Sequence, residues 1–179
     1  VVAGKPGEED VYTAAVQISK TGEQNAKLND AEFVLYYTDA EGTKQYATVK
    51  ENEYKTEEPY NYVVTGWTDD LKKAGHIKTS TVNGVDGTAI IKGVDDDNSY
   101  FFKEVVAPDG YSLNEQDAGI GEWSGEAADK KASASMTDTK LSSLPSTGGI
   151  GTTIFTIAGC LIMIAAAGLF FASRRKSAK

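Results

Sequence analysis

The run SYFFKEVV, residues 99–106, indicates the fold most directly, because its aromatic and β-branched residues favour a β-strand. Side chains two positions apart share one face of a strand, so Tyr100, Phe102 and Glu104 point the same way. The two aromatic rings identify that face as the one that packs against a core. The pattern therefore predicts a strand that directs a carboxyl group into the protein interior.

Two other predicted strands place an ionisable residue on an apolar face. In the strand expected at residues 12–20, Lys20 shares its face with Ala14, Val16 and Ile18. In the strand expected at residues 131–139, Asp138 shares its face with Ala132, Ala134 and Met136. Buried ionisable groups are costly unless they meet a partner, so we expect Lys20, Glu104 and Asp138 to lie together.

An amine and two carboxyl groups buried together favour amide formation. Burial lowers the pKa of an amine and raises that of a carboxyl group, so the neutral forms become the favoured ones. Lys20 could then attack the carboxyl carbon of Asp138 while Glu104 shuttles protons and hydrogen-bonds the tetrahedral oxygen. The expected product is an intramolecular isopeptide bond; the alternative is a buried salt-bridge cluster.

The remaining chain before residue 150 alternates short β-rich runs with turn signals and shows no convincing helical period. Turns are expected at Asp39–Gly42, Asn83-Gly84, Asp86-Gly87, Asp95–Asn98 and Pro108-Asp109-Gly110. The other strands are expected at residues 32–38, 45–50, 60–65 and 88–92. This pattern predicts an all-β domain, an antiparallel β-sandwich, at residues 11–139. Residues 1–10 are expected to be a linker or the end of a preceding domain, in a chain that begins as a fragment.

The C-terminal region predicts a single transmembrane helix. Residues 150–172 form a run of 23 without a charge, which as a helix would be roughly 34 Å long. We place the helix at residues 149–172 and a basic cytoplasmic tail at residues 173–179. Because the flanking cations mark the cytoplasmic side, the β-domain is expected outside the membrane.

Composition excludes several classes of function. The formal charge of the chain is −8, and removing the four cations after Thr147 leaves 14 cations against 26 acids, or −12. Such an acidic domain is not expected to bind nucleic acid. The single cysteine, Cys160, lies in the predicted transmembrane helix, so the domain has no disulfide and no cysteine nucleophile.

The motif LPSTG, formed by Leu144, Pro145, Ser146, Thr147 and Gly148, precedes the apolar run. Motif, apolar run and basic tail together resemble the sorting signal of Gram-positive surface proteins, with residues 140–148 as tether and motif. The resemblance implies that a sortase cleaves between Thr147 and Gly148 and passes the acyl group to an amine of a peptidoglycan precursor or of a neighbouring pilin subunit. The mature protein would then be extracellular and anchored to the cell wall, with a transient membrane span.

Three segments resemble the Cna B-type, prealbumin-like domains of Gram-positive pilins and adhesins. They are ISKTGEQNAKLNDAEFVLY, IIKGVDDDNSYFFKEVVAPDGY and SMTDTKLSSLPSTGG. In that family a lysine of the first strand joins an asparagine or aspartate of the last strand, with a glutamate as catalyst. The resemblance assigns these roles to Lys20, Asp138 and Glu104.

The sequence therefore predicts a structural surface protein, a pilin subunit or adhesin stalk, rather than an enzyme. We expect no cofactor and no metal, and a host or matrix ligand stays open. The alternatives are the membrane-proximal stalk of a wall-anchored enzyme, a ligand-binding surface module and an uncleaved membrane protein.

Other candidate sites have simpler interpretations. His76 is expected to be a solvated loop residue, and Asp95–Asn98 a hairpin turn, because no Gly or terminal Glu completes a calcium loop. The segment GIGEWSG, residues 119–125, is expected to be a loop or hairpin, since it opens no helix that could hold a phosphate. The aromatic residues are expected to fill the core rather than form an adhesive face: Trp67, Trp123, Tyr54, Tyr60 and Tyr62.

Overall fold

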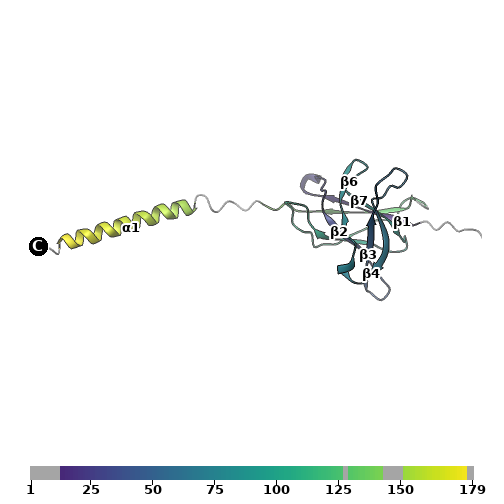
Figure 1. Cartoon of the computed structure of the whole chain (residues 1–179), viewed down its shortest axis with the longest axis horizontal. Helices are drawn as coiled ribbons and strands as arrows, with labels where there is room; N and C mark the ends of the chain where they lie inside the picture. The colour runs from purple at the N-terminus through teal and green to yellow at the C-terminus, as the bar shows by residue number, and fades with distance from the viewer. Residues whose placement is uncertain (1–12, 127–128, 143–150, 177–179) are drawn as a thin grey trace, which may run out of the picture. The chain divides into compact units, whose positions relative to one another are not determined.

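The computed structural model describes residues 13–126, 129–142 and 151–176, which belong to two separate units (Figure 1). The first unit ends at Leu141 and is built from β-strands. The second contains the helix α1, Gly151–Lys176. The β-unit carries the candidate site.

Ten strands make up the described part of the β-unit, together with two single-turn 3₁₀ helices, Glu23–Asn25 and Leu71–Lys73. The strands are β1 (Ala14–Thr21), β2 (Glu32–Thr38), β3 (Lys44–Glu51), β4 (Tyr62–Thr68), β5 (Ile77–Lys78), β6 (Ser80–Val82), β7 (Val85–Val94), β8 (Phe101–Val106), β9 (Ala118–Gly119) and β10 (Lys131–Thr137).

The strands form one sheet in the order β10-β1-β7-β4-β3-β2-β8-β9, with β5 paired to β2 and β6 to β7. The sheet curls around a single main core, so the predicted all-β, sandwich-like fold is confirmed. The pairing is mixed, however, and not antiparallel throughout. The ladders β1–β10 and β4–β7 are parallel, which side-chain alternation cannot reveal because it carries no information on strand direction.

The core is formed by the faces that alternation predicts. β1 and β10 are buried at every second residue, and in β8 Phe102 and Glu104 point inward while Lys103 does not. The main cluster takes apolar side chains from the strands at both ends of the sheet order and from the middle. Val34, Tyr36 and Tyr46 form a smaller cluster on the other face of the sheet.

The free edge of β10 is covered by the segment that follows β9. The Gly121 N–H donates to the Ser133 carbonyl oxygen at 2.9 Å, and Ser124 exchanges backbone hydrogen bonds with Lys131. The segment 119–125 is thus the loop that the sequence predicts, and it closes the sheet toward a barrel. Covering an edge in this way prevents it from pairing with another chain.

Several boundaries differ from the prediction. The predicted turn Asp86-Gly87 is wrong, because both residues lie inside β7, where Gly87 adopts φ +69°. The hairpin instead turns at Asn83-Gly84, both with positive φ, as the other turn prediction states. β10 ends at Thr137, so Asp138 lies just beyond it. The short strands β5, β6 and β9 were too brief to show an alternating pattern.

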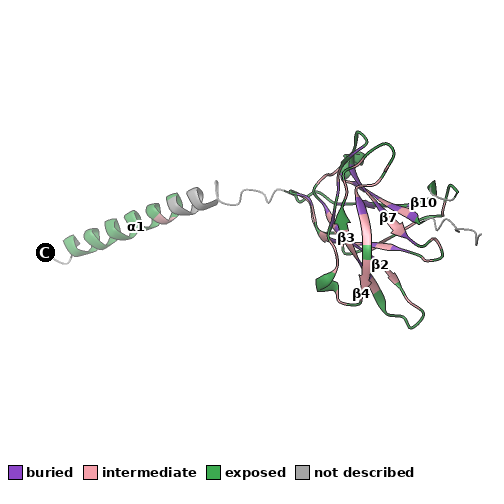
Figure 2. Ribbon diagram, turned by 45° about the vertical axis from the view of Figure 1, so that its right-hand side comes forward, coloured by how far each residue is buried: buried purple, intermediate pink, exposed green. Residues whose placement is uncertain are grey.

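The helix α1 is the one candidate membrane span among the described residues. Its span, Ile157–Arg175, has a mean hydropathy of 1.9 and none of it is buried (Figure 2). The helix continues to Lys176, beyond the predicted end at residue 172. Lys and Arg are good helix formers and suit a helix C-terminus, which explains the extension into the basic residues.

Candidate functional site

The three ionisable residues predicted to point inward come from three different strands and meet in the core. Lys20 precedes the last residue of β1 and lies opposite Met136 of β10. Glu104 belongs to β8 and pairs with Phe33 of β2. The Asp138 N–H donates to the Thr21 carbonyl oxygen at 2.9 Å, so the β1–β10 pairing extends past β10 and fixes Asp138 next to β1.

The three side chains are in direct contact. Lys20 Nζ lies 2.8 Å from Glu104 Oε1 and also contacts Asp138 Oδ1. No part of the three side chains is exposed to solvent. The amine also lies over the Phe33 ring, 5.5 Å from its centroid, which supplies an apolar wall. One amine and two carboxyl groups are therefore enclosed together without water access.

The electrostatics of the cluster favour a proton on Glu104. Burial raises the pKa of the Glu104 carboxyl, and the neighbouring Asp138 charge acts in the same direction. The Asn114 N–H and the Lys20 amine oppose this rise by stabilising the charged form. Among the described residues, Asp138 Oδ2 has no hydrogen-bond partner. A protonated Glu104 can donate to an oxygen and later accept a proton, which is what amide formation between its neighbours requires.

Asn114 is a residue of the site that sequence reasoning missed. Its backbone N–H donates to Glu104 Oε2 at 2.8 Å, and its side-chain amide donates to the Thr137 carbonyl oxygen at 3.0 Å. It lies in an irregular segment between β8 and β9, where no periodic pattern marks a residue as inward-facing. Only the turn signal at residues 108–110, now confirmed, pointed to this segment.

The other polar candidates have structural explanations. His76 is exposed and its Nδ1 lies 2.7 Å from Glu32 Oε2. The carboxylates of Asp95, Asp96 and Asp97 approach one another, but Asp96 pairs with Lys130 and Asp95 accepts the Asp97 N–H within the turn. These contacts are those of a turn, as predicted. The prediction of a hairpin is wrong, however, because the turn joins β7 to β8, which do not pair with each other.

The tryptophans belong to the core edge, as expected, and not to an adhesive face. Both are partly buried against the main core. Tyr100 lies between them, stacked on Trp67 with ring centroids 5.7 Å apart and edge-on to Trp123 at 6.3 Å. Tyr62 is buried as well. The prediction of a core role is wrong for Tyr54 and Tyr60, because both are half-exposed.

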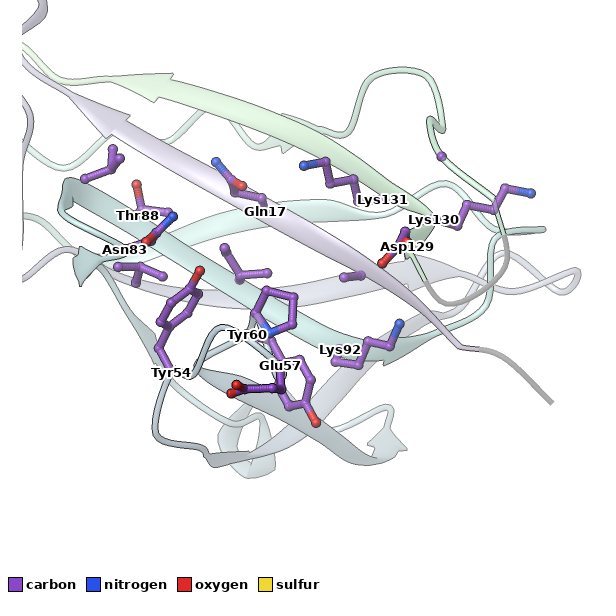
Figure 3. Close-up of a pocket in the computed structure, with 16 residues that line it drawn as sticks. Gln17, Tyr54, Glu57, Tyr60, Asn83, Thr88, Lys92, Asp129, Lys130 and Lys131 are labelled. Atoms are coloured by element: carbon purple, nitrogen blue, oxygen red, sulfur yellow. The ribbon is translucent and has the colours of Figure 1, made fainter. Parts of the chain in front are cut away.

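Tyr54 and Tyr60 line a groove of about 700 Å³ on the outer face of β1, β7 and β10 (Figure 3). The loop between β3 and β4 carries both rings, and Asn61 ties this loop to β7 through the Ile90 N–H, which donates to Asn61 Oδ1 at 2.7 Å. Figure 3 shows Gln17 and Lys131 on the opposite side of the groove from the two rings. The groove is a second surface feature, separate from the buried cluster.

The sorting motif, residues 144–148, lies outside the described residues, so its role stays a prediction from sequence. Comparison with known proteins supports the interpretation of the C-terminal region, which contains this motif, as a cell-wall anchor. Residues 137–179 match the LPXTG cell wall anchor motif. With its apolar C-terminal helix, the chain is a cell-wall-anchored extracellular surface protein.

The β-unit also matches a known protein family. Residues 14–139 match the prealbumin-like fold domain SpaA, which covers most of the chain. The protein belongs to this SpaA prealbumin-like domain family. The predicted resemblance to an anchored, prealbumin-like surface protein is therefore confirmed.

Three relatives illustrate the match. The trypsin-resistant surface T6 protein of Streptococcus pyogenes serotype M6 is 29% identical over 131 residues, or 73% of this chain and 23% of that protein. The group B streptococcus pilus 2b backbone protein has a TM-score of 0.50 and 22% identity, over 74% of this chain and 43% of that one. Shaft pilin SpaA of Lactobacillus rhamnosus GG has a TM-score of 0.50 and 18% identity, over 75% of this chain and 50% of that one. This chain thus spans about a quarter of the curated relative and half or less of the two pilins, whose similarity shows the fold.

Proposed function

We propose that the protein is a structural subunit of a Gram-positive surface assembly, a pilin subunit or adhesin stalk, whose domain is locked by an amide between Lys20 and Asp138. The observation that carries the proposal is the enclosed contact of Lys20 with both Glu104 and Asp138. Keeping three charged side chains buried carries a large desolvation penalty. An amide between Lys20 and Asp138 removes two of those three charges.

The reaction is a condensation assisted by Glu104. The neutral Lys20 amine attacks Cγ of Asp138 and forms the new C–N bond, while the protonated Glu104 carboxyl donates to an Asp138 oxygen. Glu104 then accepts a proton from the new ammonium nitrogen and returns it to the departing oxygen. The C–O bond to the oxygen that has received both protons breaks and one water leaves. The Asp138 carboxylate, the neutral amine and one proton from Glu104 have then become the amide and water, and Glu104 is left ionised.

Such a reaction can proceed once without an enzyme, because folding supplies the proximity. Reacting groups held in contact behave as if present at very high concentration. The register of β1 with β10 and the hydrogen bond from the Asp138 N–H to the Thr21 carbonyl oxygen fix both reactants before the bond forms. The amide would take the place of the disulfide that the domain lacks.

The second part of the proposal concerns the C-terminal signal. A sortase cleaves between Thr147 and Gly148 and transfers the Thr147 acyl group to an amine, either of a peptidoglycan precursor or of a neighbouring pilin subunit. Pro145 favours an extended backbone at Leu144, which suits a protease-like groove. The helix α1 and its cations hold the chain at the membrane until transfer and are then discarded.

A second candidate function is ligand binding, and the groove beside Tyr54 and Tyr60 is the observation that favours it. A binding screen of the soluble domain against host-matrix components, repeated with Tyr60→Ala, tests this candidate. Loss of a binding signal in Tyr60→Ala would support the groove as the binding site.

The isopeptide bond is tested by the intact mass of a soluble fragment, residues 1–143, which retains the whole β-unit. We expect the wild-type mass to be short by one water, and the full calculated mass for Glu104→Ala and Asp138→Ala. Lys103→Ala, whose side chain points away from the core, is the matched control and should keep the deficit.

A substitution at Asp138 identifies the acceptor. Asp138→Asn offers an amide carbon to the same amine, so its mass should fall short by one ammonia instead of one water. A wild-type fragment of full calculated mass would reject the bond. A deficit that persists in Asp138→Ala would mean that another side chain is the acceptor.

A further inference from the structure

Residues 110–114, which we call the strap, connect the three chain segments that carry the reacting groups. The strap follows the turn after β8, the strand that contains Glu104. It runs beside the chain that leaves β10: Tyr111 pairs with Lys140, and the Ser112 N–H donates to the Thr139 carbonyl oxygen at 3.0 Å. The strap thus joins the strand of Glu104 to the segment that carries Asp138.

The strap also contacts the end of β1. Tyr111 packs on Gly22, two residues after Lys20, so closely that a Cβ on Gly22 would lie 2.6 Å from the Tyr111 ring. A larger residue at position 22 would push the ring away. The strap therefore contacts both the chain that leaves β1 and the chain that leaves β10.

Within the strap, Asn114 contacts both the catalytic residue, Glu104, and the residue that precedes the acceptor, Asp138. Its backbone N–H holds Glu104 Oε2, on the catalytic side. Its side-chain amide holds the carbonyl oxygen of Thr137, the residue before Asp138, on the acceptor side. Its Oδ1 accepts the Gln116 N–H at 3.0 Å, which fixes the orientation of the amide.

We propose that Asn114 is a positioning residue for amide formation, which sets the Glu104 carboxyl and the Asp138 backbone at the distance the reaction needs; this inference rests on the proposed function. Glu104 would otherwise be free to rotate away from the amine, because its second oxygen would have no fixed donor. The Thr137 contact ties the last residue of β10, next to Asp138, to the strap.

A cavity of about 410 Å³ lies where the strap meets the segment after β10, and Asn114 and Asp138 are both among its lining residues. The condensation releases one water beside Asp138, in a cluster that is otherwise closed to solvent. Asn114 and Asp138 both line this cavity, which is the exit that we infer for the released water.

The test measures the rate at which freshly folded chains lose one water. Chains of residues 1–143 are recovered unbonded in urea, diluted into buffer, and sampled by intact mass. Asn114→Ala removes the Thr137 contact but keeps the backbone donor, and we expect bond formation to slow by about five- to tenfold, the effect of one hydrogen bond. Gln116→Ala, in the same segment and with its backbone N–H retained, is the matched control and should react at the wild-type rate.

A pH profile separates positioning of Glu104 from a general loss of structure. The groups that face Glu104 are Lys20 from β1, Asp138 after β10 and the Asn114 N–H, with the apolar Phe33 from β2. Asn114→Pro removes the N–H that stabilises the charged carboxyl, so the pKa of Glu104 rises. Because the reaction needs the protonated acid, the falling limb of the rate profile should move to higher pH in Asn114→Pro and stay in place in Asn114→Ala.

The outcomes distinguish the two proposals. If the wild-type chain loses no water, the proposed function fails and the role of Asn114 fails with it. If the wild-type chain loses water and Asn114→Ala reacts as fast as Gln116→Ala, the bond stands and the positioning role is wrong. Should Asn114→Pro not fold, the comparison of the two alanine variants still decides.

Discussion

Lys20 and Asp138 lie 118 positions apart in the sequence, yet their side chains touch inside the core. Their contact closes nearly the whole described β-unit into one loop, from the end of β1 to the residue after β10. A covalent bond at this point would restrict the unfolded chain far more than a bond between sequence neighbours, because the entropy removed grows with loop length.

The isosteric substitution Glu104→Gln should therefore lower the free energy of unfolding by about 5 kcal/mol, the loop-closure contribution for a cross-link of this length. The side-chain oxygen of the introduced glutamine would still accept the Asn114 N–H, so local packing is retained while the acid is lost. Urea unfolding of the wild-type and variant fragments measures the difference. An unchanged unfolding midpoint, in a variant whose mass shows that no bond formed, would show that the cross-link does not stabilise the domain.

Gly87 is expected to be essential for placing Lys20. It adopts φ +69°, and a Cβ at this position would lie 2.5 Å from the Lys20 carbonyl oxygen. Gly87→Ala should destabilise the domain by about 2–5 kcal/mol, from backbone strain and overpacking together, and should slow bond formation. Gly84→Ala is the control: it has a similar φ of +74° but nothing within 4 Å, and should cost only about 1 kcal/mol.

Equal costs at the two glycines, measured by urea unfolding, would contradict this expectation. They would mean that the positive φ alone determines the loss of stability at both positions. The close approach of the Gly87 backbone to Lys20 would then have no energetic consequence.

Alkaline pH should destabilise the domain through its buried tyrosines. Burial raises the pKa of Tyr62 and of Tyr100 above the ordinary value, so the folded state keeps protons that the unfolded state releases. The stability that depends on the neutral phenols is fully present below about pH 10 and is lost as the pH rises through the folded-state pKa values. Urea midpoints measured from neutral to strongly alkaline pH should fall in that window.

The substitution Tyr100→Phe provides the check on that pH dependence. It removes one ionisable phenol and should flatten the alkaline decline, although it also costs the hydrogen bond that the Asp95 N–H makes to the Tyr100 hydroxyl at every pH. A decline as steep as that of the wild type would assign the alkaline effect to other groups.

Sorting should change the charge of the protein in a defined way. Cleavage after Thr147 removes four cations and no acid, so the formal charge should pass from −8 to −12. Isoelectric focusing of cell-wall extracts should show the more acidic form, and an antibody against residues 173–179 should not detect it. Thr147→Ala should leave the chain in the membrane fraction with its tail, and a tail retained by the wild-type wall form would rule out cleavage.

Side-chain alternation was sufficient to find Lys20, Glu104 and Asp138, because each lies on a strand face, or just beyond one, whose other members are apolar. It could not find Asn114, which acts partly through its backbone and lies in an irregular segment. Nor could it show that β1 and β10 are parallel neighbours, since strand pairing depends on contacts between distant parts of the sequence. What the sequence could not predict was how distant segments pair and which residues of an irregular loop reach the buried site.

The parallel alignment of β1 and β10 determines how the domain would respond to tension. The chain enters β1 at Ala14 and leaves β10 at Thr137, at opposite ends of two adjacent strands that run in the same direction. Opposing forces on the two ends would slide the strands along each other, so that the hydrogen bonds of this ladder share the load and do not open one after another. The domain is thus arranged to be loaded in shear, with the Lys20–Asp138 contact at the end of the ladder from which the chain exits.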